Sequence, residues 1–186
     1  YQIVFTESGL PSGTQWSVAL NGTARSSNTS SIAFDVPAGT YAFSVEPVSG
    51  YSVSPSSGTL TVSSSTSQEI TFSQLKAVTF TESGLPAGVS WSVTLNGVTK
   101  SSTNSTITFM VPPGNYTYTI SYPGGYNASQ STGSISVSAS SVSVPVTYTA
   151  VTTTAPTPAF SFSNILIVSV IFIVIAVAVL ALARRK

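Results

Sequence analysis

Apolar and polar residues alternate along most of this chain, which is the pattern of β-strands that bury one face. The alternation is clearest over residues 2–6, 15–20, 31–36, 40–46, 59–62 and 69–72, and turn residues separate these segments. Asn21-Gly22 and Asn96-Gly97 each stand between two strand-like runs and are typical of hairpin turns. No segment before Asn164 has a helical period. The pattern predicts an all-β fold of about seven short strands per 75 residues, as a small antiparallel sandwich of immunoglobulin-like or transthyretin-like type.

The strand pattern occurs twice because the sequence is duplicated. Residues 5–18 read FTESGLPSGTQWSV and residues 80–93 read FTESGLPAGVSWSV, a displacement of 75 positions. The same displacement aligns Trp16 with Trp91 and Tyr41 with Tyr116, until a one-residue slip after about residue 65. We therefore predict two tandem extracellular sandwich domains, residues 1–75 and 76–149.

Each copy of this motif is predicted to form a structural loop at one end of its sandwich. Glycine permits a positive φ, proline stiffens the loop, and the glutamate is expected to accept hydrogen bonds from loop amides. The loop residues are Glu7, Gly9 and Pro11 in the first copy and Glu82, Gly84 and Pro86 in the second, each followed by a predicted core tryptophan, Trp16 or Trp91. Calcium is the alternative role for the glutamates, but one carboxylate per copy is few for an ion that prefers several oxygen ligands. An acid–base pair of Glu7 and Glu82 is disfavoured because the two residues belong to different domains.

The C-terminal region predicts a membrane anchor. Residues 165–183 read ILIVSVIFIVIAVAVLALA, long and apolar enough for a transmembrane helix, which we place over residues 164–183. Basic residues stay on the cytoplasmic side, so Arg184, Arg185 and Lys186 place the tail inside and the preceding domains outside. Residues 150–163 are rich in Thr and Pro and predict an extended stalk. The expected location is the cell membrane, with membrane lipid and other membrane or cell-envelope proteins as partners.

The residue inventory excludes several chemistries. The chain has no Cys and no His, which removes disulfides, the usual zinc sites and Ser-His or Cys-His catalysis, and no cofactor is indicated. Outside the tail only Arg25, Lys76 and Lys100 are basic, against five acidic residues, so nucleic-acid binding is not expected. Only 6% of residues are charged, and a surface of hydroxyls and amides suits an acidic exterior because it hardly titrates.

Some surface residues are candidates for modification or binding. Five Asn-X-Ser/Thr sequons predict N-glycans, at Asn21, Asn28, Asn104, Asn115 and Asn127. An alternative sugar-binding surface would use Tyr116, Tyr118, Tyr122 and Tyr126, although alternation within a strand is more typical of packing. The remaining enzyme hypothesis is a glycosidase with Asp35 and Glu46 as its carboxylates.

The duplicated motif also carries a family resemblance. FTESGLPSGTQWSVALNG, FTESGLPAGVSWSVTLNG, and the later FDVPAGTYAFSV and FMVPPGNYTYTI resemble a repeat of secreted and surface proteins of thermoacidophilic archaea. Among the sequences that these segments resemble are the regions outside the catalytic part of thermopsin-like acid proteases. The resemblance covers nearly all of residues 1–149 and implies an extracellular β-sandwich module of an archaeal cell envelope, without an activity.

These observations favour a non-enzymatic, single-pass surface protein that presents tandem modules for protein contacts. It would act as an accessory subunit of a membrane complex or as an envelope scaffold. S-layer anchoring or adhesion is the alternative, while a glycan-binding module, a glycosidase or a strand-donating filament subunit is less favoured.

Overall fold

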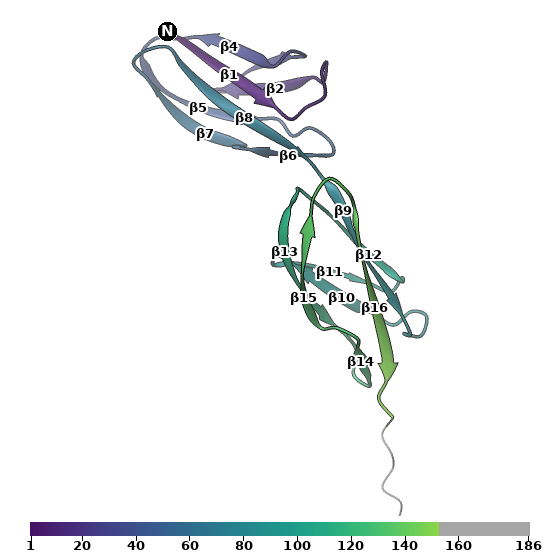
Figure 1. The fold of residues 1–186 in the computed structure, drawn as a ribbon. Helices are drawn as coiled ribbons and strands as arrows, with labels where there is room; N and C mark the ends of the chain where they lie inside the picture. Colours follow the sequence, from purple (N-terminus) through teal and green to yellow (C-terminus); the bar gives the residue numbers. More distant parts are fainter. Residues whose placement is uncertain (153–186) are drawn as a thin grey trace, which may run out of the picture. The chain divides into compact units, whose positions relative to one another are not determined.

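The computed structural model describes residues 1–152, and this part of the chain is built from β-strands, turns and loops (Figure 1). Its 16 strands form four sheets of four strands each. Each copy of the duplicated sequence supplies eight strands and two sheets. The all-β prediction is therefore confirmed for the described residues.

The first copy comprises β1 to β8. Their bounds are β1 Gln2–Ser8, β2 Trp16–Leu20, β3 Thr23–Ser27, β4 Ser31–Asp35, β5 Gly39–Val45, β6 Tyr51–Ser54, β7 Ser57–Val62 and β8 Thr66–Gln74. One sheet has the strand order β4-β1-β8-β6 and the other β3-β2-β5-β7. The chain therefore crosses between the sheets several times, and the edge strands are four to six residues long.

The second copy repeats this topology strand for strand. Its bounds are β9 Lys76–Ser83, β10 Trp91–Leu95, β11 Val98–Ser102, β12 Thr106–Val111, β13 Gly114–Ser121, β14 Tyr126–Ala128, β15 Thr132–Val137 and β16 Val142–Ala150. The sheets are β12-β9-β16-β14 and β11-β10-β13-β15. The same sequence pattern has thus produced the same sandwich twice.

Two features differ from the sequence prediction. Each copy has eight strands where about seven were expected, because β3 is polar and exposed along almost its whole length and offers no alternation to read. The sandwich is also not wholly antiparallel, since β1 runs parallel to β8 and β9 parallel to β16. Alternation reports which face of a strand is buried and says nothing of strand direction.

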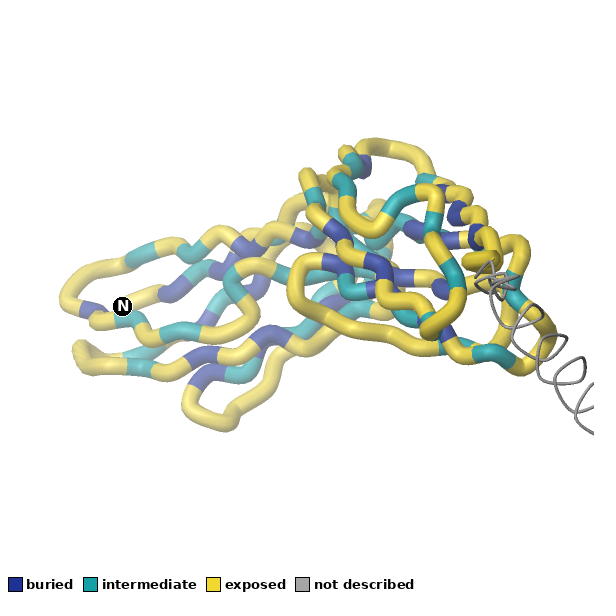
Figure 2. The backbone as a smooth tube through the Cα atoms, turned by 90° about the horizontal axis from the view of Figure 1, so that it is seen from below, coloured by how far each residue is buried: buried dark blue, intermediate teal, exposed yellow. Residues whose placement is uncertain are grey.

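Each sandwich encloses its own hydrophobic core, and buried and exposed positions alternate along its strands (Figure 2). In the first core the rings of Phe5 and Phe43 lie 5.3 Å apart, and in the second the rings of Phe80 and Tyr118 lie 5.1 Å apart. Burying each such side chain contributes about 1.5–3 kcal/mol. These cores hold the two sheets of each copy together and fix the end loops that carry the duplicated motif.

The predicted stalk residues beyond 152, the helix over 164–183 and the tail of Arg184, Arg185 and Lys186 lie outside the described residues. Within residues 1–152, no helix has the length and apolar character needed to span a bilayer.

Candidate functional site

The glutamate of the duplicated motif caps its own loop. Glu7 follows the inward-facing Ile3 and Phe5 at every second position of β1, so its side chain lies at the end of the core. Its Oε2 accepts a hydrogen bond from the Leu10 N–H at 3.3 Å. In the second copy, Oε2 of Glu82 accepts one from the Leu85 N–H at 3.4 Å. Each carboxylate is thus engaged by a backbone amide of the loop that it begins.

The motif glycines allow the loop to lie directly on β8 in the first copy and on β16 in the second. Gly9 has φ +100° and Gly84 has φ +99°, which is left-handed backbone that favours glycine. A Cβ on Gly9 would overlap the Phe72 carbonyl oxygen, and a Cβ on Gly84 would overlap that of Tyr148. These two glycines are therefore required by both backbone conformation and space.

The motif tryptophans tie the start of β2 to the β3–β4 loop and the start of β10 to the β11–β12 loop. The Trp16 Nε1–H donates to the Thr29 carbonyl oxygen at 2.8 Å, and the Trp91 Nε1–H donates to that of Asn104 at 2.8 Å. Trp16 is 2% exposed, as is Trp91. Glutamate, glycine and tryptophan of the motif are accordingly all used by the fold in both copies.

A hollow of about 410 Å³ lies beside the first motif loop. It is lined by Glu7, Leu10, Pro11, Ser12, Gly13, Thr14, Asn28, Thr29 and Ser30. Glu7 is the only carboxylate among these residues. Within residues 1–152 no three acidic side chains gather as a metal site would require. The geometry therefore adds no oxygen-rich ligand set to the calcium alternative.

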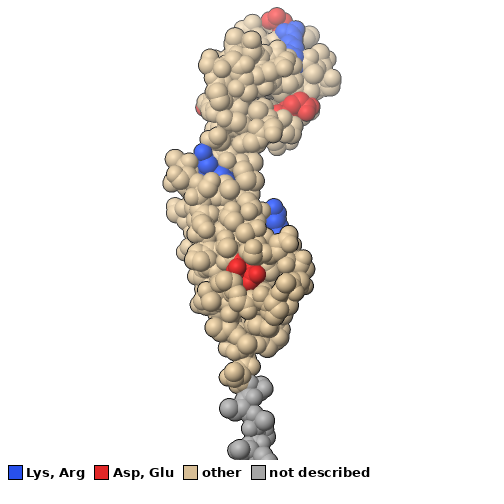
Figure 3. All heavy atoms as spheres, turned by 90° about the vertical axis from the view of Figure 1, so that its right-hand side faces the viewer, with Lys and Arg blue, Asp and Glu red and all other residues tan. Residues whose placement is uncertain are grey.

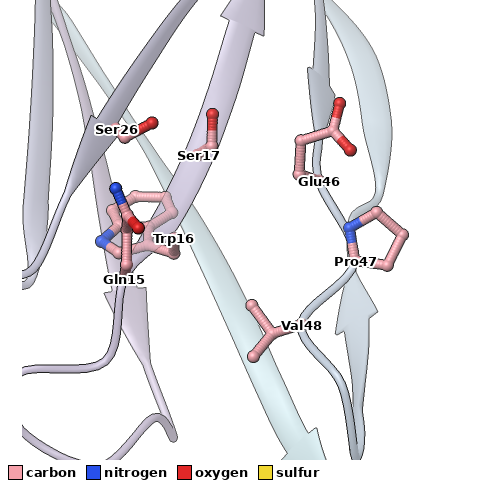
Figure 4. A pocket seen from close by; sticks show the side chains of 7 residues that line it. All are labelled: Gln15, Trp16, Ser17, Ser26, Glu46, Pro47 and Val48. Atoms are coloured by element: carbon pink, nitrogen blue, oxygen red, sulfur yellow. The ribbon is translucent and has the colours of Figure 1, made fainter.

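A shallow groove runs past the tryptophan in each copy. In the first, about 230 Å³ in volume, Gln15, Trp16, Ser17 and Ser26 lie opposite Glu46, Pro47 and Val48 (Figure 4). In the second, about 190 Å³, Tyr122 and Pro123 take the places of Pro47 and Val48. Both volumes are below those of typical ligand pockets. Because the tryptophans are almost completely buried, neither ring offers a face to a ligand.

The four tyrosines of the sugar-binding alternative do not form one surface. Tyr118 belongs to the second core, and Tyr116 and Tyr126 pack against that core. The Tyr116 hydroxyl donates to the Pro112 carbonyl oxygen at 2.6 Å and so closes a turn. Tyr122, 41% exposed, is the one that stands at the surface. Stacking of a sugar across several of these rings is therefore not supported.

The carboxylates of the glycosidase alternative lie at opposite ends of the first sandwich. Asp35 ends β4, just before β5 begins, and Glu46 follows the last residue of β5. The seven residues of β5 span about 23 Å. Glycosidase carboxylates lie about 5–9.5 Å apart. Asp35 and Glu46 therefore cannot act on one glycosidic bond, and this alternative is wrong.

All five sequon asparagines are exposed, in three kinds of setting. Asn21 lies in the β2–β3 turn with φ +45°, and its Oδ1 accepts a hydrogen bond from the Ala42 N–H at 2.8 Å. Asn28 and Asn104 lie in the loops after β3 and β11. Asn115 lies on β13 and Asn127 on β14. Glycan attachment at these positions remains a prediction.

Sequence reasoning missed a basic residue in each sandwich that links the edge strands of its two sheets by a hydrogen bond. Arg25 on β3 donates to the Ala33 carbonyl oxygen on β4, and its guanidinium lies 4.8 Å from the centre of the Phe34 ring. Lys100 on β11 donates to the Thr108 carbonyl oxygen at 2.8 Å, and its Nζ lies 5.0 Å from the Phe109 ring centre. The signal was present, because residues 25 and 100 are basic at equivalent positions of the repeat. Charged atoms are otherwise sparse on the face shown in Figure 3.

The second copy has a buried hydroxyl that the first lacks. Tyr148 is 3% exposed, and within the described residues its hydroxyl has no hydrogen-bond partner. Its ring lies 6.3 Å from that of Trp91, and Phe72 holds the same position against Trp16, also at 6.3 Å. An unpaired buried hydroxyl costs about 1–3 kcal/mol. The second copy therefore carries a penalty that the first avoids.

We expect Tyr148→Phe to raise the free energy of unfolding of the second sandwich by about 1 kcal/mol at pH 8, because it removes only the unpaired hydroxyl. The matched reverse change, Phe72→Tyr, should lower that of the first sandwich by about 1–3 kcal/mol. Urea unfolding of the full chain in detergent measures both. A loss of stability in Tyr148→Phe would show that the hydroxyl has a partner.

The same variant should change the response to alkaline pH. Burial raises the pKa of the Tyr148 hydroxyl from 10.0 to about 12, and Glu82 and Tyr122 add to the rise. The unfolded chain releases this proton first, so the associated stability is complete below pH 10 and is lost as pH rises through about 12. We expect a loss on the order of 2 kcal/mol in the wild type that Tyr148→Phe does not show. Equal losses in both proteins would contradict this assignment.

These features define a tandem β-sandwich protein whose shared motif serves the fold. No protein-family model and no curated protein matches the chain. Similar solved structures include GBS52, the minor pilin of Streptococcus agalactiae, at 10% identity and TM-score 0.42, covering 84% of this chain and 99% of that one. A streptococcal ancillary pilin matches at 15% identity and TM-score 0.39, covering 80% and 62%. The Bacillus anthracis TIE protein matches at 15% identity and TM-score 0.34, covering 78% and 33%. The chain thus spans about a third of the TIE protein, and likenesses this weak carry no conclusion about activity or partners.

Proposed function

We propose that the chain is a non-enzymatic cell-surface protein that displays two sandwich modules for protein contacts. Residues 164–183 anchor it in the membrane as one helix, with residues 150–163 as the stalk, the modules outside, and Arg184, Arg185 and Lys186 inside. It serves as an accessory subunit of a membrane complex or as a scaffold of the cell envelope, and the motif resemblance implies the envelope of an acid-living archaeon.

One observation carries the proposal. The glutamate and the tryptophan of the motif, which recur in both copies, are engaged by backbone amides and carbonyls of loops and by core rings. The duplicated motif therefore stabilises the two sandwiches. Contacts with other proteins are then made by their outer surfaces, which are rich in serine and threonine. Surfaces of this kind serve recognition and assembly through sheet edges and loops.

The second candidate, S-layer anchoring or adhesion, uses the same placement with a different partner. It is favoured by the five exposed sequon asparagines, whose glycans would stand on the outside of the modules. Membrane lipid is a partner in either case, through the predicted helix.

Single-cysteine labelling on intact cells tests the placement, because the chain has no cysteine of its own. We expect a membrane-impermeant maleimide to label Ser12→Cys, in the exposed loop after β1, without permeabilisation. A cysteine added after Lys186 should react only in permeabilised cells. Labelling in the reverse order would refute the proposed topology.

A further inference from the structure

Within residues 1–152, four strands lie at sheet edges in each sandwich, and one of them, β7 or β15, presents an uncovered and regular row of outward backbone groups. β7 and β15 are the last strands of their sheets. The Val45 N–H donates to the Ser56 carbonyl oxygen at 2.8 Å, which sets the alternation of the β5–β7 ladder. Ser57, Thr59 and Thr61 therefore direct their N–H and C=O groups away from β5.

The second copy repeats this arrangement. The Ile120 N–H donates to the Ser131 carbonyl oxygen at 2.7 Å, so the outward backbone groups of β15 belong to Thr132, Ser134 and Ser136. These residues are exposed, as are the three on β7. Both edges are regular, since every residue of β7 and β15 is paired on its inner side.

The opposite side of each sandwich is closed in a way that β7 and β15 are not. The Glu7 N–H donates to the Ser30 carbonyl oxygen at 2.9 Å, so the Ala33 carbonyl points out of the β4 edge. Arg25 donates a hydrogen bond to that carbonyl oxygen, and Lys100 donates one to the equivalent Thr108 carbonyl oxygen on β12. A charged side chain over an edge carbonyl discourages strand addition.

The two open edges carry none of the usual protection. Their sequences, SGTLTV on β7 and TGSISV on β15, contain no charge and no proline. By contrast, β6 and β14 are only four and three residues long. Neutral, regular edges of six residues, such as β7 and β15, are ones on which another strand can pair.

We propose that β7 and β15 are assembly edges, on which a second copy of this chain pairs antiparallel, edge to edge. The edges are self-complementary: each presents alternating outward N–H and C=O groups, and turning one about a two-fold axis through Thr59 or Ser134 places donors opposite acceptors. On the exposed face the paired side chains are then hydroxyls, which pair favourably across strands. On the inner face Leu60 meets Gly58 and Ile135 meets Gly133, and no like charges meet.

Pairing at one edge is short, about 20 Å over the six residues of β7. That is smaller than a standard stable interface, so a single edge gives weak association. Each chain carries two such edges, however, and membrane anchoring would concentrate the copies, which strengthens pairing through avidity. This inference rests on the proposed surface placement for that concentration, and it identifies the partner as another copy.

Disulfide trapping in the native membrane tests the edges directly. In the proposed pairing Thr59 faces Thr59 of the second copy with Cα atoms about 5.5 Å apart, within disulfide range. Thr59→Cys and Ser134→Cys are the test variants. Ala42→Cys and Thr117→Cys are matched controls, because these exposed residues lie directly beside Thr59 and Ser134 but on inner strands. We expect about tenfold more disulfide-linked dimer from the edge variants after oxidation.

Charge substitution provides the second readout. Thr59→Lys with Ser134→Lys places like charges opposite each other and should abolish self-association in detergent, whereas Ala42→Lys with Thr117→Lys should not. Unchanged circular dichroism verifies folding of both double variants. Equal cross-linking of edge and control variants would overturn the inference, as would trapping of a different protein at Thr59→Cys. Either result leaves the surface placement standing, because maleimide labelling tests it separately.

Discussion

Replacing Gly9 by Ala lowers the free energy of unfolding of the first sandwich by about 2–5 kcal/mol. Two physical effects add. A residue with a Cβ is strained by roughly 1–2 kcal/mol at the positive φ of Gly9. Its Cβ also overlaps the Phe72 carbonyl oxygen, which is backbone of a central strand and cannot move without disturbing β8. Overpacking of this kind costs a further 1–3 kcal/mol or so.

Gly13→Ala is the matched control, since Gly13 lies in the same loop with φ +83° and nothing lies within 4 Å of its added Cβ. We expect it to cost only about 1–2 kcal/mol, from backbone strain. Urea unfolding followed by Trp16 fluorescence in a Trp91→Phe background measures both variants. Gly84→Ala should reproduce the larger effect in the second sandwich, against Tyr148. Equal losses in Gly9→Ala and Gly13→Ala would show that the loop does not lie on β8 as described.

Replacing Trp91 by Ala is expected to lower the free energy of unfolding of the second sandwich by about 3–5 kcal/mol. The change empties a fully buried site and leaves the Asn104 carbonyl oxygen without its donor. Trp91→Phe keeps most of the apolar volume and loses the hydrogen bond, so we expect about 1–2 kcal/mol.

The duplication makes this experiment internally controlled. The chain has two tryptophans, one per sandwich. When Trp91 is replaced, Trp16 fluorescence reports only the first sandwich, while circular dichroism reports both. We expect the Trp16 transition to remain unchanged while the second sandwich unfolds at lower denaturant. Tyr122→Ala, a change at an exposed ring beside Trp91, should cost well under half as much, and a comparable loss would argue against the tryptophan as the core anchor.

The strands and the duplication could be predicted because they depend on local pattern. A strand with one buried face, such as Trp16–Leu20, has an apolar residue at every second position, and these residues are the buried ones. The repeated motif could likewise be assigned to a loop, because glycine and proline restrict the backbone through their own covalent structure. Residues 1–152 bear out this local part of the prediction.

Other features depend on which strands become neighbours, and local pattern does not contain that information. The edge strand β3 is exposed on both faces and therefore shows no alternation. The parallel pairing of β1 with β8 joins residues more than 60 positions apart. The contact of Arg25 with β4 and the open edges of β7 and β15 appear only when sheet order is known. The candidate functional surface was for this reason less predictable than the fold.

Extraction of the chain from its native membrane in mild detergent, followed by native gel electrophoresis and mass spectrometry of the band, tests the proposed role in protein contacts most directly. The account predicts a defined assembly of fixed stoichiometry that contains further copies of the chain or other envelope proteins. Migration as a single chain with no co-migrating protein, at a concentration matched to the membrane, would contradict it.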